Sequence, residues 1–282
     1  MRTSTLAVVA FALSAGTATA QQNLSNLEQE GKSNKATVEQ VGFANQSLLI
    51  QNDDANASLV SQAGAGNASE VQVEGPSSEV TVFQLGDGNT VASLITEANA
   101  VAAVTQEGDG NTARQEVDAP DSRAIISVVG DGNVTLQTIA GVENNVAEVE
   151  AAGDGNTIAQ AVTGENARSY VSIWGSDNVA VTEQTGVSNN ISLLQEGDGN
   201  EATVFQHGDN NFAGGEEDPQ LTQLGNDNLI SLNQEGNMNT ASISQLGDGN
   251  EAVNVQVGNE NVSAISQIGH DNHATVTQRG GQ

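Results

Sequence analysis

Residues 223–278 repeat the pattern Q-x-G-x-x-N at a spacing of eleven: QLGNDN from Gln223, QEGNMN from Gln234, QLGDGN from Gln245, QVGNEN from Gln256 and QIGHDN from Gln267. A short fixed period means that each copy is one supersecondary unit, which buries its apolar face only by stacking on its neighbours. The stretch therefore predicts a solenoid, and we interpret the rest of the chain against its register.

Within one copy, inward and outward side chains alternate. Counting from Asn239, the second, fourth and sixth residues are Ala241, Ile243 and Gln245, and the order Ala-Val-Gln follows Asn272 in the same places. Alternation at period two is typical of a strand with one buried face. The G-x-x-N that follows is typical of a tight turn, because Gly adopts positive φ freely and Asn tolerates it. Each eleven-residue copy is thus predicted to be one strand and one turn.

The turns fall alternately into two classes. In the looser class, Asp53, Glu97 and Ala119 replace the glycine. In the stricter class every copy has Gly, with Asn three residues later, and we predict these to be turn glycines: Gly42, Gly64, Gly86, Gly108, Gly130, Gly153, Gly175, Gly197, Gly225, Gly247 and Gly269. The rung is therefore 22 residues long, strand-turn-strand-turn, with the stricter turns along one edge (the strict edge) and the others along the opposite edge (the loose edge). This predicts an all-β, two-sheet parallel β-solenoid of about eleven rungs.

The middle of the chain departs from the pattern. There, Val117, Ile139 and Ile173 are among the aliphatic residues that replace the Gln before the turn. The replacement indicates that this place faces inward, because a buried amide must be hydrogen-bonded or give way to an apolar group. We expect segment 117–173 to add apolar burial without amide ladders, and the terminal segments 29–62 and 223–278 to drive self-association.

Two segments lie outside the repeat. Residues 1–20 begin with Met1 and Arg2, continue through an apolar run and end in small residues, which predicts a secretory signal peptide. Residues 21–282 form the repeat array, and an insertion near 214–219 that contains Pro219 predicts a loop, because Pro cannot donate to a β-ladder.

Composition excludes several classes of protein. Hydrophobic residues make up 37% of the chain and aromatic residues 2%, which is too little bulk for a deep core. Cysteine is absent, so neither disulfides nor thiolate metal sites stabilise the fold. The formal net charge of −29 disfavours binding to nucleic acid or to anionic lipid. We expect no nucleic-acid partner and no insertion into a membrane.

Repeats such as NEATVFQHGDNN from Asn200 to Asn211 resemble the curlin repeat of curli, the secreted functional amyloid fibres of bacterial surfaces. The resemblance extends from about Leu24 to Gln278. It implies export to the outside of the cell through outer-membrane secretion machinery, end-to-end stacking with itself and with a second curlin-type subunit, and roles in biofilm matrix and adhesion. It also implies an amide ladder for assembly at Gln29, Gln40, Gln51, Gln62, Asn45, Asn67, Gln206, Gln223, Gln234, Gln245, Gln256, Gln267, Gln278, Asn250 and Asn272.

The sequence gives weaker support to a catalytic or a metal-binding site. We expect no enzyme and no cofactor, since acid-base chemistry needs paired groups in a cleft and a uniform solenoid offers none. An alternative is a calcium-stabilised extracellular β-solenoid adhesin that does not polymerise, and a polysaccharide-processing β-helix is a third reading. The calcium alternative rests on the motif GDGN, which occurs at the strict-edge turns that begin at Gly86, Gly108, Gly130, Gly153, Gly197 and Gly247. We expect no metal site, and the candidate ligands from these turns are Asp87, Asp109, Asp131, Asp154 and Asp198. These carboxylates are predicted to stack about 4.8 Å apart, where like charges repel.

Overall fold

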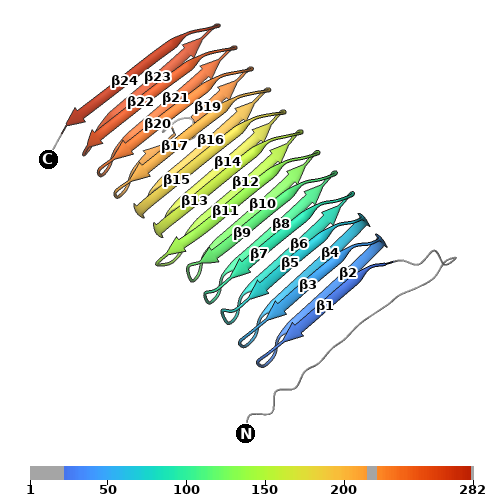
Figure 1. The fold of residues 1–282 in the computed structure, drawn as a ribbon. Helices are drawn as coiled ribbons and strands as arrows, with labels where there is room; N and C mark the ends of the chain where they lie inside the picture. The colour runs from blue at the N-terminus through green and yellow to red at the C-terminus, as the bar shows by residue number, and fades with distance from the viewer. Residues whose placement is uncertain (1–21, 215–220, 281–282) are drawn as a thin grey trace.

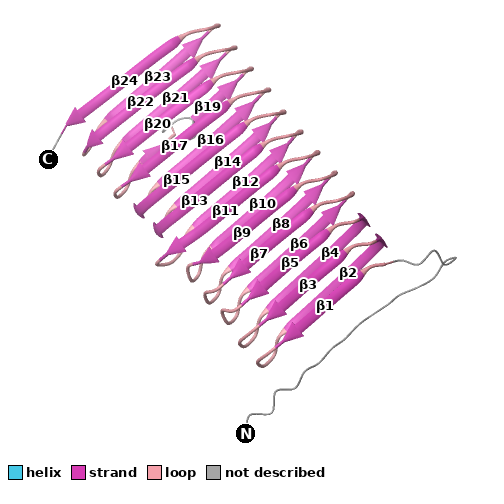
Figure 2. Ribbon diagram, in the orientation of Figure 1, coloured by secondary structure: helices cyan, strands magenta, loops and turns pink. Residues whose placement is uncertain are grey.

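The computed structural model describes residues 22–214 and 221–280. In these residues every regular element is a β-strand (Figure 2), and they include no helix that could span a membrane. The strands stack in chain order from one end of the molecule to the other and alternate between two sheets (Figure 1). The predicted two-sheet parallel β-solenoid is confirmed.

Both sheets are parallel throughout. The first sheet has twelve strands: β1 (Leu24–Gln29), β3 (Gln46–Gln51), β5 (Ala68–Val73), β7 (Thr90–Ile95), β9 (Thr112–Asp118), β11 (Val134–Gly141), β13 (Thr157–Glu165), β15 (Val179–Val187), β17 (Glu201–His207), β20 (Leu229–Glu235), β22 (Glu251–Gly258) and β24 (His273–Gly280). The second sheet contains β2 (Lys35–Phe43), β4 (Ala57–Ala65), β6 (Glu79–Leu85), β8 (Val101–Glu107), β10 (Arg123–Val129), β12 (Val146–Ala152), β14 (Arg168–Trp174), β16 (Asn190–Glu196), β18 (Phe212–Ala213), β19 (Leu221–Leu224), β21 (Thr240–Leu246) and β23 (Val262–Ile268).

The register follows the 22-residue rung, so that Thr90 pairs with Thr112. One extra residue, in the turn between β11 and β12, makes Val134 pair with Thr157. The longer insertion divides a single strand level into β18 and β19, and both halves pair with β16. Residues 215–219 of the predicted loop and residues 1–20 of the predicted signal peptide lie outside the described residues.

The core lies between the two sheets and is thin. Aliphatic side chains such as Leu49, Ile126 and Ile243 are fully buried, whereas the outward Phe83 and Trp174 are exposed, as the alternation predicted. Burying each large aliphatic side chain contributes about 1.5–3 kcal/mol. Backbone hydrogen bonds also continue around the turns from rung to rung. The turns are therefore stacked as regularly as the strands.

Candidate functional site

Buried glutamines form columns parallel to the solenoid axis. In each column the Nε2 of one Gln donates to the Oε1 of the Gln one rung further along, and we call such a column a Gln ladder. The first sheet has Gln29–Gln51 (2.6 Å) and Gln184–Gln206–Gln234–Gln256–Gln278 (2.8–2.9 Å). The second sheet has Gln40–Gln62–Gln84–Gln106 (2.7–3.1 Å) and Gln195–Gln223–Gln245–Gln267 (2.9–3.1 Å).

These ladders contain every glutamine named from the sequence, together with four others. Gln84 and Gln106 extend one ladder toward the middle of the chain, and Gln184 and Gln195 begin the two C-terminal ladders. The signal was available in the sequence, because all four precede a turn at the same place as the others. Four Gln ladders therefore stabilise the two ends of the array.

A fifth Gln ladder runs through the middle. Gln115 donates to Gln137 at 2.9 Å, and Gln137 donates to Gln160 at 2.8 Å. The expectation that segment 117–173 lacks amide ladders was therefore wrong. These glutamines lie two residues before the aliphatic place, on the same inward face, and their spacing of 22 and 23 residues could have revealed them.

Asparagines form a second kind of column at the turns. Along the strict edge, the side-chain Oδ1 of each Asn accepts the backbone N–H of the Asn one rung later at 2.8–3.2 Å, without interruption from Asn23 to Asn272. The side-chain amide also caps the next turn: Asn111 Nδ2 donates to the carbonyl of Gly130 at 2.7 Å. Along the loose edge the column is broken at Ala100 and Ala167, which have no side-chain acceptor.

The strict-edge glycines are required for two reasons. Gly108 has φ of +117°, a backbone conformation that side-chain-bearing residues rarely adopt. A Cβ added there would also lie 2.2 Å from the carbonyl oxygen of Gly130 in the next rung. The second glycine of the same turn, Gly110, has φ of +67° and open space around the position of a Cβ. Only the first glycine is fixed by the stacking of the rungs.

The predicted carboxylate column is present, but its side chains have a structural role. Asp87 accepts the N–H of Ala65, and the N–H groups of Asp87, Asp109 and Asp131 donate to the carboxylates of Asp109, Asp131 and Asp154 at 2.7–2.8 Å. Ser176 separates this run from Asp198, which accepts the N–H of Ser176. Each carboxylate thus accepts a hydrogen bond from the turn one rung earlier in the chain, which offsets part of the predicted repulsion between neighbouring carboxylates.

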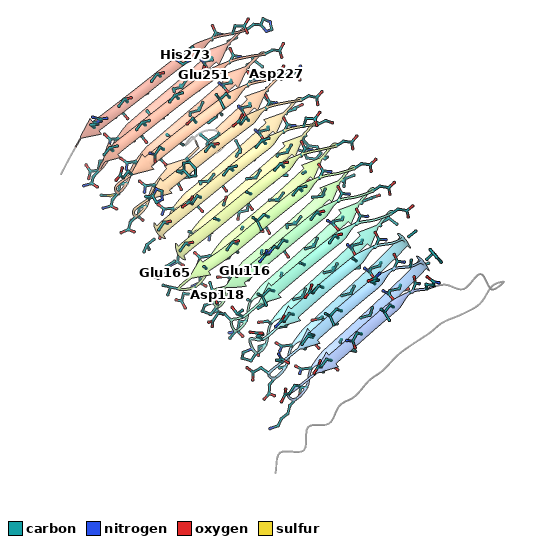
Figure 3. The ribbon with its side chains drawn as sticks, viewed as in Figure 1. Glu116, Asp118, Glu165, Asp227, Glu251 and His273 are labelled. Atoms are coloured by element: carbon teal, nitrogen blue, oxygen red, sulfur yellow. The ribbon has the colours of Figure 1, made fainter. Side chains whose placement is uncertain are left out.

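Each histidine lies close to one carboxylate. His270 lies 3.4 Å from Asp248, and His273 lies 3.1 Å from Glu251 at the end of the solenoid (Figure 3). Figure 3 also shows Asp227 at the strict edge and Glu165 at the opposite edge. Within residues 22–214 and 221–280, no group of three potential ligands is placed to hold a metal ion.

A family profile described as curlin associated repeat matches residues 175–208, 225–253 and 255–280. No curated protein matches the chain. The matched segments contain most of the two C-terminal Gln ladders, and the break between the first two segments contains the loop insertion. The C-terminal part of the chain, from residue 175 to residue 280, therefore contains curlin associated repeats.

Proposed function

We propose that this protein is a structural subunit, not an enzyme, that stacks end to end into curli-like amyloid fibres on the outside of the cell. The first and last described strands of each sheet pair on one side only, which leaves an open row of N–H and C=O groups at each end. Such rows template the addition of another chain. The match to curlin associated repeats supports a fibre subunit, and export by the predicted signal peptide would deliver it.

The observation that carries the proposal is the polarity of the Gln ladders. In the interior, most ladder Nε2 atoms donate twice: that of Gln245 donates to Gln267 Oε1 and to the carbonyl of Leu229. At the C-terminal end, the Nε2 of Gln278 donates to the carbonyl of Val262, and if the ladder geometry continued, its second N–H would extend toward the open end. At the other end, Gln29 and Gln40 donate into the solenoid, so their Oε1 atoms face outward.

The two ends are therefore complementary. Donors of Gln267 and Gln278 would meet acceptors of Gln40 and Gln29 on the next copy. Two like ends would instead place donor against donor or acceptor against acceptor. Continued amide ladders stabilise cross-β stacks, and an unmet buried amide costs about 1–3 kcal/mol. We infer that growth is head to tail and that a second curlin-type subunit with the same columns would be accepted at either end. Fibres of this kind would serve biofilm matrix and adhesion.

The test compares two double variants. Gln267→Lys/Gln278→Lys places charges where the next copy would stack, and Ser266→Lys/Thr277→Lys places them on the outward faces of the same two strands. Electron microscopy and fibre diffraction should show fibres with a spacing of about 4.8 Å along the axis for the wild type and the outward variant, and none for the inward variant. A wild-type chain that stays monomeric, or equal fibre formation by both variants, would contradict the proposal.

A further inference from the structure

One column of outward side chains in the second sheet is apolar along almost its whole length. It consists of the residue immediately before the first glycine of each strict-edge turn, and we call it the apolar stripe: Val41, Ala63, Leu85, Val129, Ala152, Trp174, Leu224, Leu246 and Ile268, interrupted by Glu107 and Glu196. Consecutive members are direct partners in the parallel register of the sheet. The stripe therefore runs along one edge from the first rung to the last.

Most large members of the stripe are open to solvent, and Leu224 is half-buried. The exposed fractions are 58% for Val41, 52% for Leu85, 46% for Trp174, 49% for Leu246 and 76% for Ile268. The corresponding column of the first sheet is mostly polar and includes Asn52, Glu74, Thr96, Asp118, His207 and Glu235. The solenoid fold is compatible with polar residues at this place, so folding alone does not account for the stripe. Contiguous exposed apolar surface of this kind marks an interaction site.

The sheet that bears the stripe is also the less acidic one. The strands of the first sheet carry nine carboxylates and two arginines, whereas those of the second carry six carboxylates and three cations. Strands β18, β19, β21 and β23 have no charged residue in their described lengths. A chain with a net charge of −29 associates with itself most easily through its least charged face. A basic partner would instead be attracted to the first sheet.

We propose that the apolar stripe is an interface that joins two copies of this chain side by side. Its members recur at about 4.8 Å over eleven levels, a length of about 48 Å, and a second copy offers the same repeat. With a width of about 10 Å, the contact would bury about 1,000 Å² in total, the lower limit for a specific interface. This lateral contact is independent of the end-to-end stacking in the proposed function, and in a fibre it would pair two filaments.

The first experiment removes the stripe. Leu85→Ser/Trp174→Ser/Leu246→Ser is compared with a control that changes exposed apolar residues elsewhere, Val134→Ser/Leu136→Ser/Val142→Ser. Circular dichroism checks that both variants fold, and sedimentation velocity of freshly prepared chains measures self-association before fibres appear. We expect the dissociation constant of the stripe variant to rise about tenfold or more, equivalent to about 1.4 kcal/mol, while the control matches the wild type.

A second pair of variants strengthens the interface. Glu107→Leu/Glu196→Leu completes the stripe and should tighten the dimer, whereas Glu116→Leu/Glu183→Leu on the first sheet should not. If fibres form, electron microscopy should show bundles for the wild type and single filaments for the serine variant. Equal association of the stripe and control variants, or a wild type that stays monomeric at high concentration and forms only unpaired filaments, would overturn the proposal. If fibres fail to form altogether, the sedimentation result still decides it.

Discussion

At the scale of single residues, the two glycines of one strict-edge turn are subject to different structural constraints. Gly108 lies against the backbone of the next rung and has φ of +117°, whereas Gly110 lies in open space with φ of +67°. Other rungs place Asp177 and Asp227 where Gly110 stands, with φ of +57° and +54°. The first glycine is required for stacking, and the second only favours a left-handed conformation.

We therefore expect Gly108→Ala to lower the free energy of unfolding by at least about 1–3 kcal/mol, the usual cost of a strained backbone, because the methyl group would meet the Gly130 carbonyl. Gly110→Asn should change it by less than about 0.5 kcal/mol. Urea denaturation followed by circular dichroism measures both. Equal losses for the two variants would show that positive φ alone, and not the close approach of the rungs, fixes these glycines.

A glutamine inside a Gln ladder should also be costly to replace. Gln206→Leu leaves Gln184 Nε2 without its side-chain acceptor and Gln234 Oε1 without its donor. At about 1–3 kcal/mol for each unmet buried group, we expect a loss of about 2–4 kcal/mol in thermal or chemical denaturation. The exposed Gln46→Leu is the control and should be close to neutral. A neutral Gln206→Leu would mean that the amides stack without contributing to stability.

At the scale of the element, the loose-edge turns contain a gap that can be filled. Ala167 donates its N–H to Asn145 Oδ1 but offers no side-chain acceptor to Asn189. An Asn there would accept the Asn189 N–H and place its amide near the carbonyl of Gly186, as Asn145 does with Gly164. The column along this edge would then run unbroken from Asn145 to Asn261.

We expect Ala167→Asn to raise the free energy of unfolding by about 0.5–1.5 kcal/mol, the net contribution of a typical hydrogen bond. Ala180→Asn, which buries the same amide in the apolar core, should instead destabilise the chain. Differential scanning calorimetry of the two variants and the wild type makes the comparison. A destabilised Ala167→Asn would indicate that the loose-edge turn has no room for the side chain.

A similar prediction concerns the carboxylates along the strict edge. Asn226 already accepts the N–H of Asp198 at 2.9 Å in the same column, so an amide oxygen serves as well as a carboxylate. We expect Asp109→Asn to be neutral or stabilising, since it keeps the acceptor and removes a like charge, and Asp109→Ala to cost about 0.5–1.5 kcal/mol. Thermal denaturation at low and high salt separates the two effects. Equal behaviour of both variants would contradict the structural role of the column.

At the scale of the whole molecule, the net charge opposes the end-to-end stacking of copies that the Gln ladders would favour. Copies that carry a net charge of −29 repel one another as they approach, and salt screens that repulsion over about 10 Å at 0.1 M. Protonation of the carboxylates lowers the repulsion, although it also weakens the strict-edge acceptors. Only the end rungs form each junction between copies, whereas the whole chain contributes to the repulsion. We therefore expect the lower repulsion to affect assembly more than the weaker strict-edge acceptors do.

Fibre formation should therefore be faster at pH 4.5 than at pH 7.5, and at pH 7.5 it should be faster in 0.5 M salt or in millimolar Ca²⁺ than in low salt. Light scattering at a fixed chain concentration gives the rates. Magnesium at the same concentration is the control for the calcium arm: equal acceleration indicates screening, and acceleration by Ca²⁺ alone would favour a calcium-stabilised solenoid. Rates that do not change with pH or salt would show that charge does not limit assembly.

The amino-acid sequence was enough to predict the solenoid, the 22-residue rung, the inward face of each strand and the difference between the two edges. It could do so because period and parity depend only on neighbours along the chain. Tertiary structure decided which stacked side chains pair, since a ladder needs donor and acceptor at the same level in rungs 22, 23 or 28 residues apart. Hence the role of the carboxylates as N–H acceptors and the exposure of the apolar stripe became visible only when the rungs were placed above one another.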